Sequence, residues 1–310
     1  MLELMTASKQ PEGHIGLDGT ISLVGAITGT LTVNTLSECS AIYGNEAFCS
    51  ISGNSNGTAV RTALRLNLDT LVTSNAFFDQ SNVGTGRRAV QVIWNGSWLI
   101  SYGGNAKINF TKVARNGGNL NTSSALGWAR AGAAYSANNF TGYMFGGVNS
   151  TLCGRITSPQ TGQTTAVSIT PPSYFTAGAL GHVSAQATSK GVAYIKNAGM
   201  GGFVRFDMVN ETWAQLEAGP EDIHSDGVWD GDDAIYFVGG PRGGKVTTLH
   251  RYGIKSGRWT NTPLNGDLYD AWLPTVWLSE KVHMQWYNDS IYMWRIDNAH
   301  ASAKQMYKIL

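Results

Sequence analysis

The sequence predicts an all-β chain built from a repeated four-stranded unit, on three observations. Only 14% of the residues are charged, and Gly, Ser, Thr and Asn fill most of the other polar positions. Gly and Asn supply the positive φ angles that tight hairpins need. Short apolar runs follow polar turns, and the same strand–turn–strand pattern returns along most of the chain. This combination favours turn-rich sheets over helices.

The repeated pattern is a short alternating strand, a polar turn and an apolar strand that often ends in Gly-Gly. The clearest copy covers residues 89–94, turns at 95–97 and continues over 98–104. The other hairpins are expected within residues 40–51, 130–147, 182–195, 227–240 and 282–294. Strands that are buried on both faces read as continuous apolar runs, so the second strand of each hairpin is expected in the interior.

A second pair of strands follows the hairpin in at least two of these units. Tyr252 precedes Trp259 by seven residues across a polar turn, and Phe206 precedes Trp213 by the same spacing. With the apolar quartet and the double glycine at 239–240, this arrangement resembles the kelch repeat. The fourth unit lacks the double glycine, and the second and third units lack the aromatic–Trp pair, so the repeats are divergent.

The resemblance implies a six-bladed β-propeller of four-stranded antiparallel blades over about residues 36–310. Large aromatic side chains would then fill the space between adjacent blades, which widens towards the rim. A β-sandwich with similar hairpins is the alternative. The propeller is favoured because sandwiches do not repeat a four-stranded unit.

The ends of the chain are expected to share one blade. Residues 305–310 fall where the third strand of the last blade belongs, which leaves an open edge unless another strand pairs with it. Residues 28–33 alternate and precede the first hairpin, so they are predicted to be the N-terminal strand that closes the ring. The predicted organisation is an N-terminal arm over residues 1–27 and a propeller domain over residues 28–310.

Composition and charge argue against several classes of partner. There are 22 basic and 21 acidic residues, a net charge of +1, so neither nucleic acid nor membrane insertion is expected. No apolar stretch is long enough to span a bilayer, and residues 1–11 lack the features of a secretory signal. Cys39, Cys49 and Cys153 are too few for a disulfide framework. Whether Cys39 and Cys49 pair is left open.

No strong catalytic motif is present. The sequence has no phosphate-binding loop, no Gly-X-Ser-X-Gly and no His-Glu-X-X-His. His182, His224 and His283 fall near the start of three successive units and could converge on a metal. Ordinary hydrogen-bonded histidines are favoured, because the spacings to the following strands differ.

An acidic run offers a second candidate for cation binding. Its members are Glu221, Asp222, Asp226, Asp230, Asp232 and Asp233. Solvated turns are favoured over calcium binding, because the run lacks the spacing of a calcium loop. No cofactor and no metal are therefore expected.

Two loops carry the predicted binding residues. Tyr269, Asp270 and Trp272 lie in the loop over residues 264–277, and Tyr174 and Phe175 lie in the loop over residues 171–175. Exposed aromatic side chains beside polar groups can stack on sugar rings or anchor a protein partner. Packing between blades is the alternative role for each of them.

These observations favour a non-enzymatic structural or binding module. The neutral, charge-poor composition is similar to that of phage structural proteins, which implies a virion component such as a tail, nozzle or fibre-associated protein. Its expected partners are other structural subunits, including copies of itself, or a surface glycan. A carbohydrate-active enzyme with a site at the channel mouth is the alternative, and an intracellular kelch-type adaptor is a third possibility. The expected location is the virion, with the cytoplasm as the alternative.

Overall fold

The computed structural model describes most of the chain, with gaps at several loops. The described residues are 17–29, 37–43, 45–55, 58–79, 90–94, 98–103, 109–114, 119–123, 132–136, 141–147, 150–157, 165–176, 183–188, 190–197, 200–223, 225–241, 245–266, 282–294 and 305–310.

Every regular element in this part of the chain is a β-strand, as the composition predicts, and the strands form separate, mostly four-stranded sheets. The first sheet holds β2 (Thr28–Gly29), β3 (Ser37–Tyr43), β4 (Glu46–Ser55), β5 (Thr58–Asn67) and β6 (Val72–Asp79). The second holds β7 (Val90–Trp94), β8 (Trp98–Gly103), β9 (Asn109–Ala114) and β10 (Asn119–Ser123). The third holds β11 (Gly132–Ser136), β12 (Thr141–Gly147), β13 (Ser150–Thr157) and β14 (Thr165–Ile169).

The second half of the chain repeats this arrangement. The fourth sheet holds β15 (Val183–Ala187), β16 (Val192–Asn197), β17 (Phe203–Asp207) and β18 (Thr212–Gln215). The fifth holds β19 (Val228–Trp229), β20 (Ala234–Gly239), β21 (Thr248–Gly253) and β22 (Arg258–Pro263). The sixth holds β1 (Thr20–Ala26), β23 (Asn265–Gly266), β24 (His283–Tyr287), β25 (Ser290–Trp294) and β26 (Gln305–Ile309).

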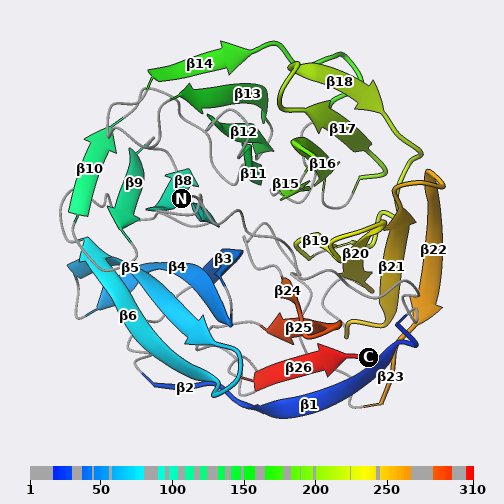
Figure 1. Cartoon of the computed structure of the whole chain (residues 1–310), viewed down its shortest axis with the longest axis horizontal. Coiled ribbons are helices and arrows are strands. Elements are labelled where there is room, and N and C mark those ends of the chain that lie inside the picture. The colour runs from blue at the N-terminus through cyan, green and yellow to red at the C-terminus, as the bar shows by residue number, and fades with distance from the viewer. Residues whose placement is uncertain are drawn as a thin grey trace, which may run out of the picture.

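The sheets lie around a common centre, with the first strand of each hairpin innermost (Figure 1). The innermost strands contact one another in the order β3, β7, β11, β15, β19 and β24, and β24 in turn contacts β3. Strands that follow one another in the chain are hydrogen-bonded neighbours, so each sheet forms mainly from local pairings. The predicted hairpins are present as β3–β4, β7–β8, β11–β12, β15–β16, β19–β20 and β24–β25.

The second strands of these hairpins show why the apolar runs are continuous. Every residue of β16 and of β20 is buried, because neighbouring sheets cover both faces of each strand.

The turn between β24 and β25 has the conformation that its residues favour. Asn288 and Asp289 have φ values of 47° and 55°, a conformation that a tight hairpin turn needs and that Asn and Asp tolerate.

The aromatic–Trp spacing corresponds to a cross-strand pair. Phe206 lies opposite Trp213, and Tyr252 lies opposite Trp259. Each Trp also reaches an adjacent sheet, since the Trp213 ring lies 5.8 Å from that of Phe145 and the Trp259 ring lies 4.9 Å from that of Phe203. These indoles therefore fill the space between neighbouring sheets, as their spacing predicts.

The strand that completes the last sheet differs from the predicted one. β1 pairs antiparallel with β26, and Ile21 lies opposite Ile309. The prediction placed residues 28–33 there, but Thr28 and Gly29 pair in parallel with β6 of the first sheet, and residues 30–33 lie outside the described part. Residues 20–26, assigned to the predicted arm, are thus part of a sheet, and residues 1–16 lie outside the description.

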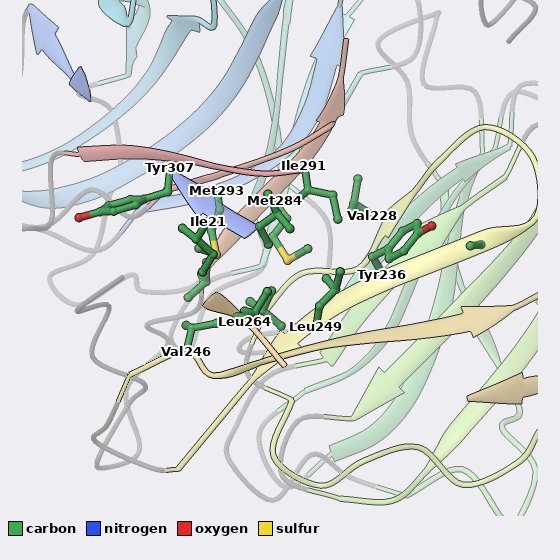
Figure 2. Close-up of a cluster of buried hydrophobic side chains, with 14 residues drawn as sticks. Ile21, Val228, Tyr236, Val246, Leu249, Leu264, Met284, Ile291, Met293 and Tyr307 are labelled. Carbon is green, nitrogen blue, oxygen red and sulfur yellow. The ribbon is translucent and has the colours of Figure 1, made fainter. Parts of the chain in front are cut away.

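The burial of Ile21 explains why the earlier segment takes this place. Its side chain is only 1% exposed and packs in a core shared by the fifth and sixth sheets. Figure 2 shows Ile21 beside Met293 and Tyr307 of the sixth sheet, with Val246, Leu249 and Leu264 close by. β1 is also held by the parallel pairing of Thr20 and Ile21 with β23, so it lies between the C-terminal strand and the segment that follows β22 of the fifth sheet.

Candidate functional site

A surface groove of about 490 Å³ lies between the fourth and fifth sheets. This volume is within the range of small-ligand sites. The groove is lined by residues of the β15–β16 turn, β16, β17, the segment after β18, the β19–β20 region and the β21–β22 region. We call it the intersheet groove, and its lining residues are Thr188, Lys190, Val192, Tyr194, Arg205, Leu216, Trp229, Asp232, Tyr252, Ile254, Lys255, Ser256 and Gly257.

Two tyrosines line the groove from opposite sheets. Tyr194 of β16 and Tyr252 of β21 have ring centroids 6.0 Å apart, and both rings are almost fully buried in the cluster that joins the sheets. Burial raises the pKa of both hydroxyls above the usual value of 10.0. Both hydroxyls are therefore protonated at neutral pH and able to donate a hydrogen bond.

Basic side chains dominate the charge of the groove. Lys190, Arg205 and Lys255 line it, against the single carboxylate of Asp232. The Lys255 ammonium lies 3.1 Å from Asp232 Oδ1, which leaves the other two cations without this counter-ion. The groove therefore favours an anionic group over a neutral or cationic one.

Arg205 is partly buried, whereas Lys190 and Lys255 are exposed. Arg205 lies opposite Tyr194 in the pairing of β16 with β17. Within the described residues its guanidinium makes no hydrogen bond and no ion pair. A partly desolvated guanidinium presents donors in a fork that matches a carboxylate, so this side chain is suited to anion recognition.

Lys196, at the other end of β16, is a buried lysine that sequence reasoning missed. It is only 1% exposed, and Nζ donates a hydrogen bond of 2.8 Å to the Asn197 carbonyl and another to the Met200 carbonyl. Burial lowers its pKa from 10.5 to about 8, against the opposing charges of Glu221 and Asp222. The Lys196 ammonium therefore binds two backbone carbonyl groups where β16 leads into the β16–β17 loop.

The predicted binding residues fall into two sets. Tyr269, Asp270 and Trp272 lie outside the described residues, so their role stays a prediction. Phe175 is only 3% exposed and packs 5.3 Å from the ring of Trp213, and Tyr174 is partly buried against the same cluster. Phe175 is therefore a packing residue in this structure, which was the alternative role considered for it.

The predicted histidine constellation is described only in part. His283 is 1% exposed, and its Nδ1 lies 3.3 Å from Asp226 Oδ2. His182 and His224 lie outside the described residues. A further buried histidine, His250, has Nδ1 2.8 Å from Asn261 Oδ1 and Nε2 3.1 Å from Asp222 Oδ1. These histidines thus contact carboxylates or an amide on neighbouring segments.

Four side chains of the acidic run contact backbone N–H groups or histidines of neighbouring segments. Asp230 is buried and accepts hydrogen bonds from the backbone N–H groups of Asp232 and Ala234, and Asp233 accepts one from that of Lys255. Asp222 and Asp226 face histidines. In the described part of the chain, no three His, Cys, Asp or Glu side chains form a group that could hold a metal ion.

Cysteine and membrane features add little to the choice of site. Burial raises the pKa of the Cys153 thiol to about 12, so it is a packing residue rather than a nucleophile. Cys39 and Cys49 lie opposite each other in the backbone pairing of β3 with β4. Among the described residues no helix has the length and apolar character needed to cross a membrane.

No protein-family model and no curated protein matches this chain. The chain is similar to the solved structure of YjhT, with 14% identity over 89% of this chain and 94% of the other and a TM-score of 0.59. It is also similar to a streptogramin B lyase, with 9% identity over 94% and 97% of the two chains and a TM-score of 0.58. A protein of unknown function from Bacteroides thetaiotaomicron matches with 11% identity over 93% and 74% and a TM-score of 0.57.

These likenesses bear on the fold alone, because the identities are low. They give no support to a virion role, to phage tail assembly or to host recognition. Together with the separate antiparallel sheets around a common centre, they show that the chain folds as a β-propeller.

Proposed function

We propose that this chain is a six-bladed, divergent kelch-like propeller, closed by β1, that acts as a non-enzymatic binding or assembly module. In this proposal the six sheets are the blades, and the intersheet groove is the site where a partner docks. The contact of β24 with β3 and the pairing of β1 with β26 support closure. The aromatic–Trp pairs in register on two adjacent sheets support the kelch-like character.

The observation that carries the binding role is Arg205. It is a partly buried cation, placed opposite Tyr194 in a groove that Tyr252 also lines, with no ionic partner in the described residues. Removing a guanidinium from water without pairing it is unfavourable for folding alone. A bound anion would recover that cost. Because the fold is shared with a lyase, the non-enzymatic role rests on this groove and not on the fold.

The test is to screen the immobilised full-length chain against a displayed library of random peptides. The same screen is run on Ser256→Trp, which places an indole at an exposed position of the groove wall without removing a core side chain. We expect enriched peptides that bind the native chain and are lost on the variant. Enrichment that is equal on both proteins, or no enrichment at all, would contradict a docking role for the groove.

A further inference from the structure

The intersheet groove combines two kinds of surface that together define a partner. Apolar side chains of Leu216, Ile254 and Trp229 line it beside the basic groups of Arg205, Lys190 and Lys255. The three cations come from three separate elements, namely β17, the β15–β16 turn and the β21–β22 turn. One small anion would contact one or two of them, whereas a chain segment with several carboxylates can reach all three.

Asp232 is paired with Lys255, and two further carboxylates near the groove make other contacts. Asp207 accepts hydrogen bonds from the backbone N–H groups of Val209 and Asn210. Its pKa is lowered chiefly by the Asn210 N–H, and the Arg205 charge is a smaller cause. Asp233 accepts from the Lys255 backbone and lies 3.5 Å from Arg251. Neither carboxylate forms an ion pair with Arg205, so its guanidinium remains available to an incoming group.

The groove that Arg205 lines also offers an aromatic surface. Trp229 is partly exposed, and its Nε1 donates a 3.3 Å hydrogen bond to the Asp232 carbonyl, which fixes the indole at the groove. A fixed aromatic ring costs little conformational entropy when it is covered, so it is a suitable anchor for an apolar side chain. An Asp or Glu next to an apolar residue in a partner would match this pair.

We propose that the intersheet groove docks an acidic, apolar-containing peptide segment of a partner protein, with a partner carboxylate on Arg205 and an adjoining apolar side chain on Trp229. The proposal rests on the binding role proposed above and names the chemistry of the partner. Tyr194 and Tyr252 line the same groove as Arg205, and each carries a hydroxyl that can donate a hydrogen bond. Docking is favoured by charge complementarity and weakens with salt.

The experiment uses the full chain and three fluorescein-labelled peptides of equal length. The first carries Glu-Phe-Glu-Leu between Gly-Ser flanks, the second has Gln in place of both Glu residues, and the third has Lys there. Fluorescence anisotropy is measured at low and high salt. We expect the Glu peptide to bind, the Gln peptide to bind at least about tenfold more weakly and the Lys peptide to give no saturable signal.

Two variants locate the contact. Arg205→Gln should weaken binding of the Glu peptide by about tenfold or more, since a charge-assisted hydrogen bond is lost. Arg258→Gln makes the same charge change at a side chain that is 75% exposed and outside the groove, so it should have little effect. A thermal melt of each variant checks that the fold is retained.

Several outcomes would overturn this inference and leave the docking role itself standing. Equal binding of the Glu and Gln peptides would show that Arg205 does not bind a carboxylate. An equal loss of affinity in Arg205→Gln and Arg258→Gln would show the same. Full displacement of the peptide by N-acetylglutamate alone would assign the groove to a small acid. No binding of any defined peptide, alongside groove-dependent library peptides of other composition, would refute the acidic partner only.

Discussion

Tyr287 donates a 2.7 Å hydrogen bond from its hydroxyl to Asp69 Oδ1, which joins two residues that are 218 positions apart. Asp69 lies in the turn between β5 and β6 of the first sheet, and Tyr287 ends β24 of the last. The same carboxylate accepts a hydrogen bond from Asn45 Nδ2, and the Asn45 and Tyr287 donors lower the pKa of Asp69. The first and last sheets are therefore neighbours.

A truncation tests whether β1 is essential to this arrangement. Deleting residues 1–27 removes the strand that pairs with β26 and exposes the backbone groups of that edge. Each buried group left unpaired costs about 1–3 kcal/mol, and the loss of buried Ile21 adds about 2–5 kcal/mol. We expect this chain to lose its cooperative thermal transition, as measured by circular dichroism.

The control deletion removes residues 1–16 and leaves β1 whole. It should melt close to the intact chain. If the longer deletion retains the same melting temperature, the chain does not depend on β1 and the proposed closure is wrong.

The buried Lys196 predicts a particular dependence of stability on pH. Because its pKa is lowered to about 8 in the folded chain, the unfolded chain binds more protons between about pH 8 and its ordinary value of 10.5. The free energy of unfolding should therefore rise with pH from about 8, by at most about 1.4 kcal/mol per pH unit from this group. Tyr194, Tyr236 and Tyr252 have raised pKa values, so their ionisation in the unfolded state opposes the rise above 10.0.

Denaturant unfolding measured from about pH 8 to just below 9 isolates the lysine, because the raised pKa of the buried Cys153 thiol opposes the rise above its ordinary value of 9.0. Lys196→Met should remove the rise, because the thioether has no proton to lose. Lys190→Met, at an exposed position, makes the same change of charge and should keep it. A rise that persists unchanged in Lys196→Met would show that another group causes it.

The sequence predicted the hairpins well because they are local. The turn at Asn288-Asp289 and the apolar run after it are adjacent in the chain, so both can be recognised without knowing which other segments pack on them. The closing strand was misplaced because residues 20–26 and 28–33 both alternate. The choice between them depends on the core that receives Ile21, which forms between the fifth and sixth sheets. No local pattern carries that information.

The candidate site was less predictable for the same reason. Arg205 and Trp229 have no unusual sequence context, and they line one groove only because the fourth and fifth sheets are adjacent. Lys196 reads as an ordinary polar end of an apolar run until its burial is known. Aromatic loop residues were predicted to be exposed, whereas Phe175 is in the core, because its loop folds back against Trp213.

Phe175 and the pair Tyr269–Trp272 provide the last test, since the sequence assigned both to binding. Phe175→Ala should destabilise the chain by about 3–5 kcal/mol, because it empties a site packed against Trp213 and the position of Gly146. Replacing Tyr269 and Trp272 together by Ala should change stability by only about 0.5 kcal/mol if they are exposed. Chemical denaturation gives both values. A large loss for the pair would assign them to packing between the sheets as well, and would contradict their predicted role in binding.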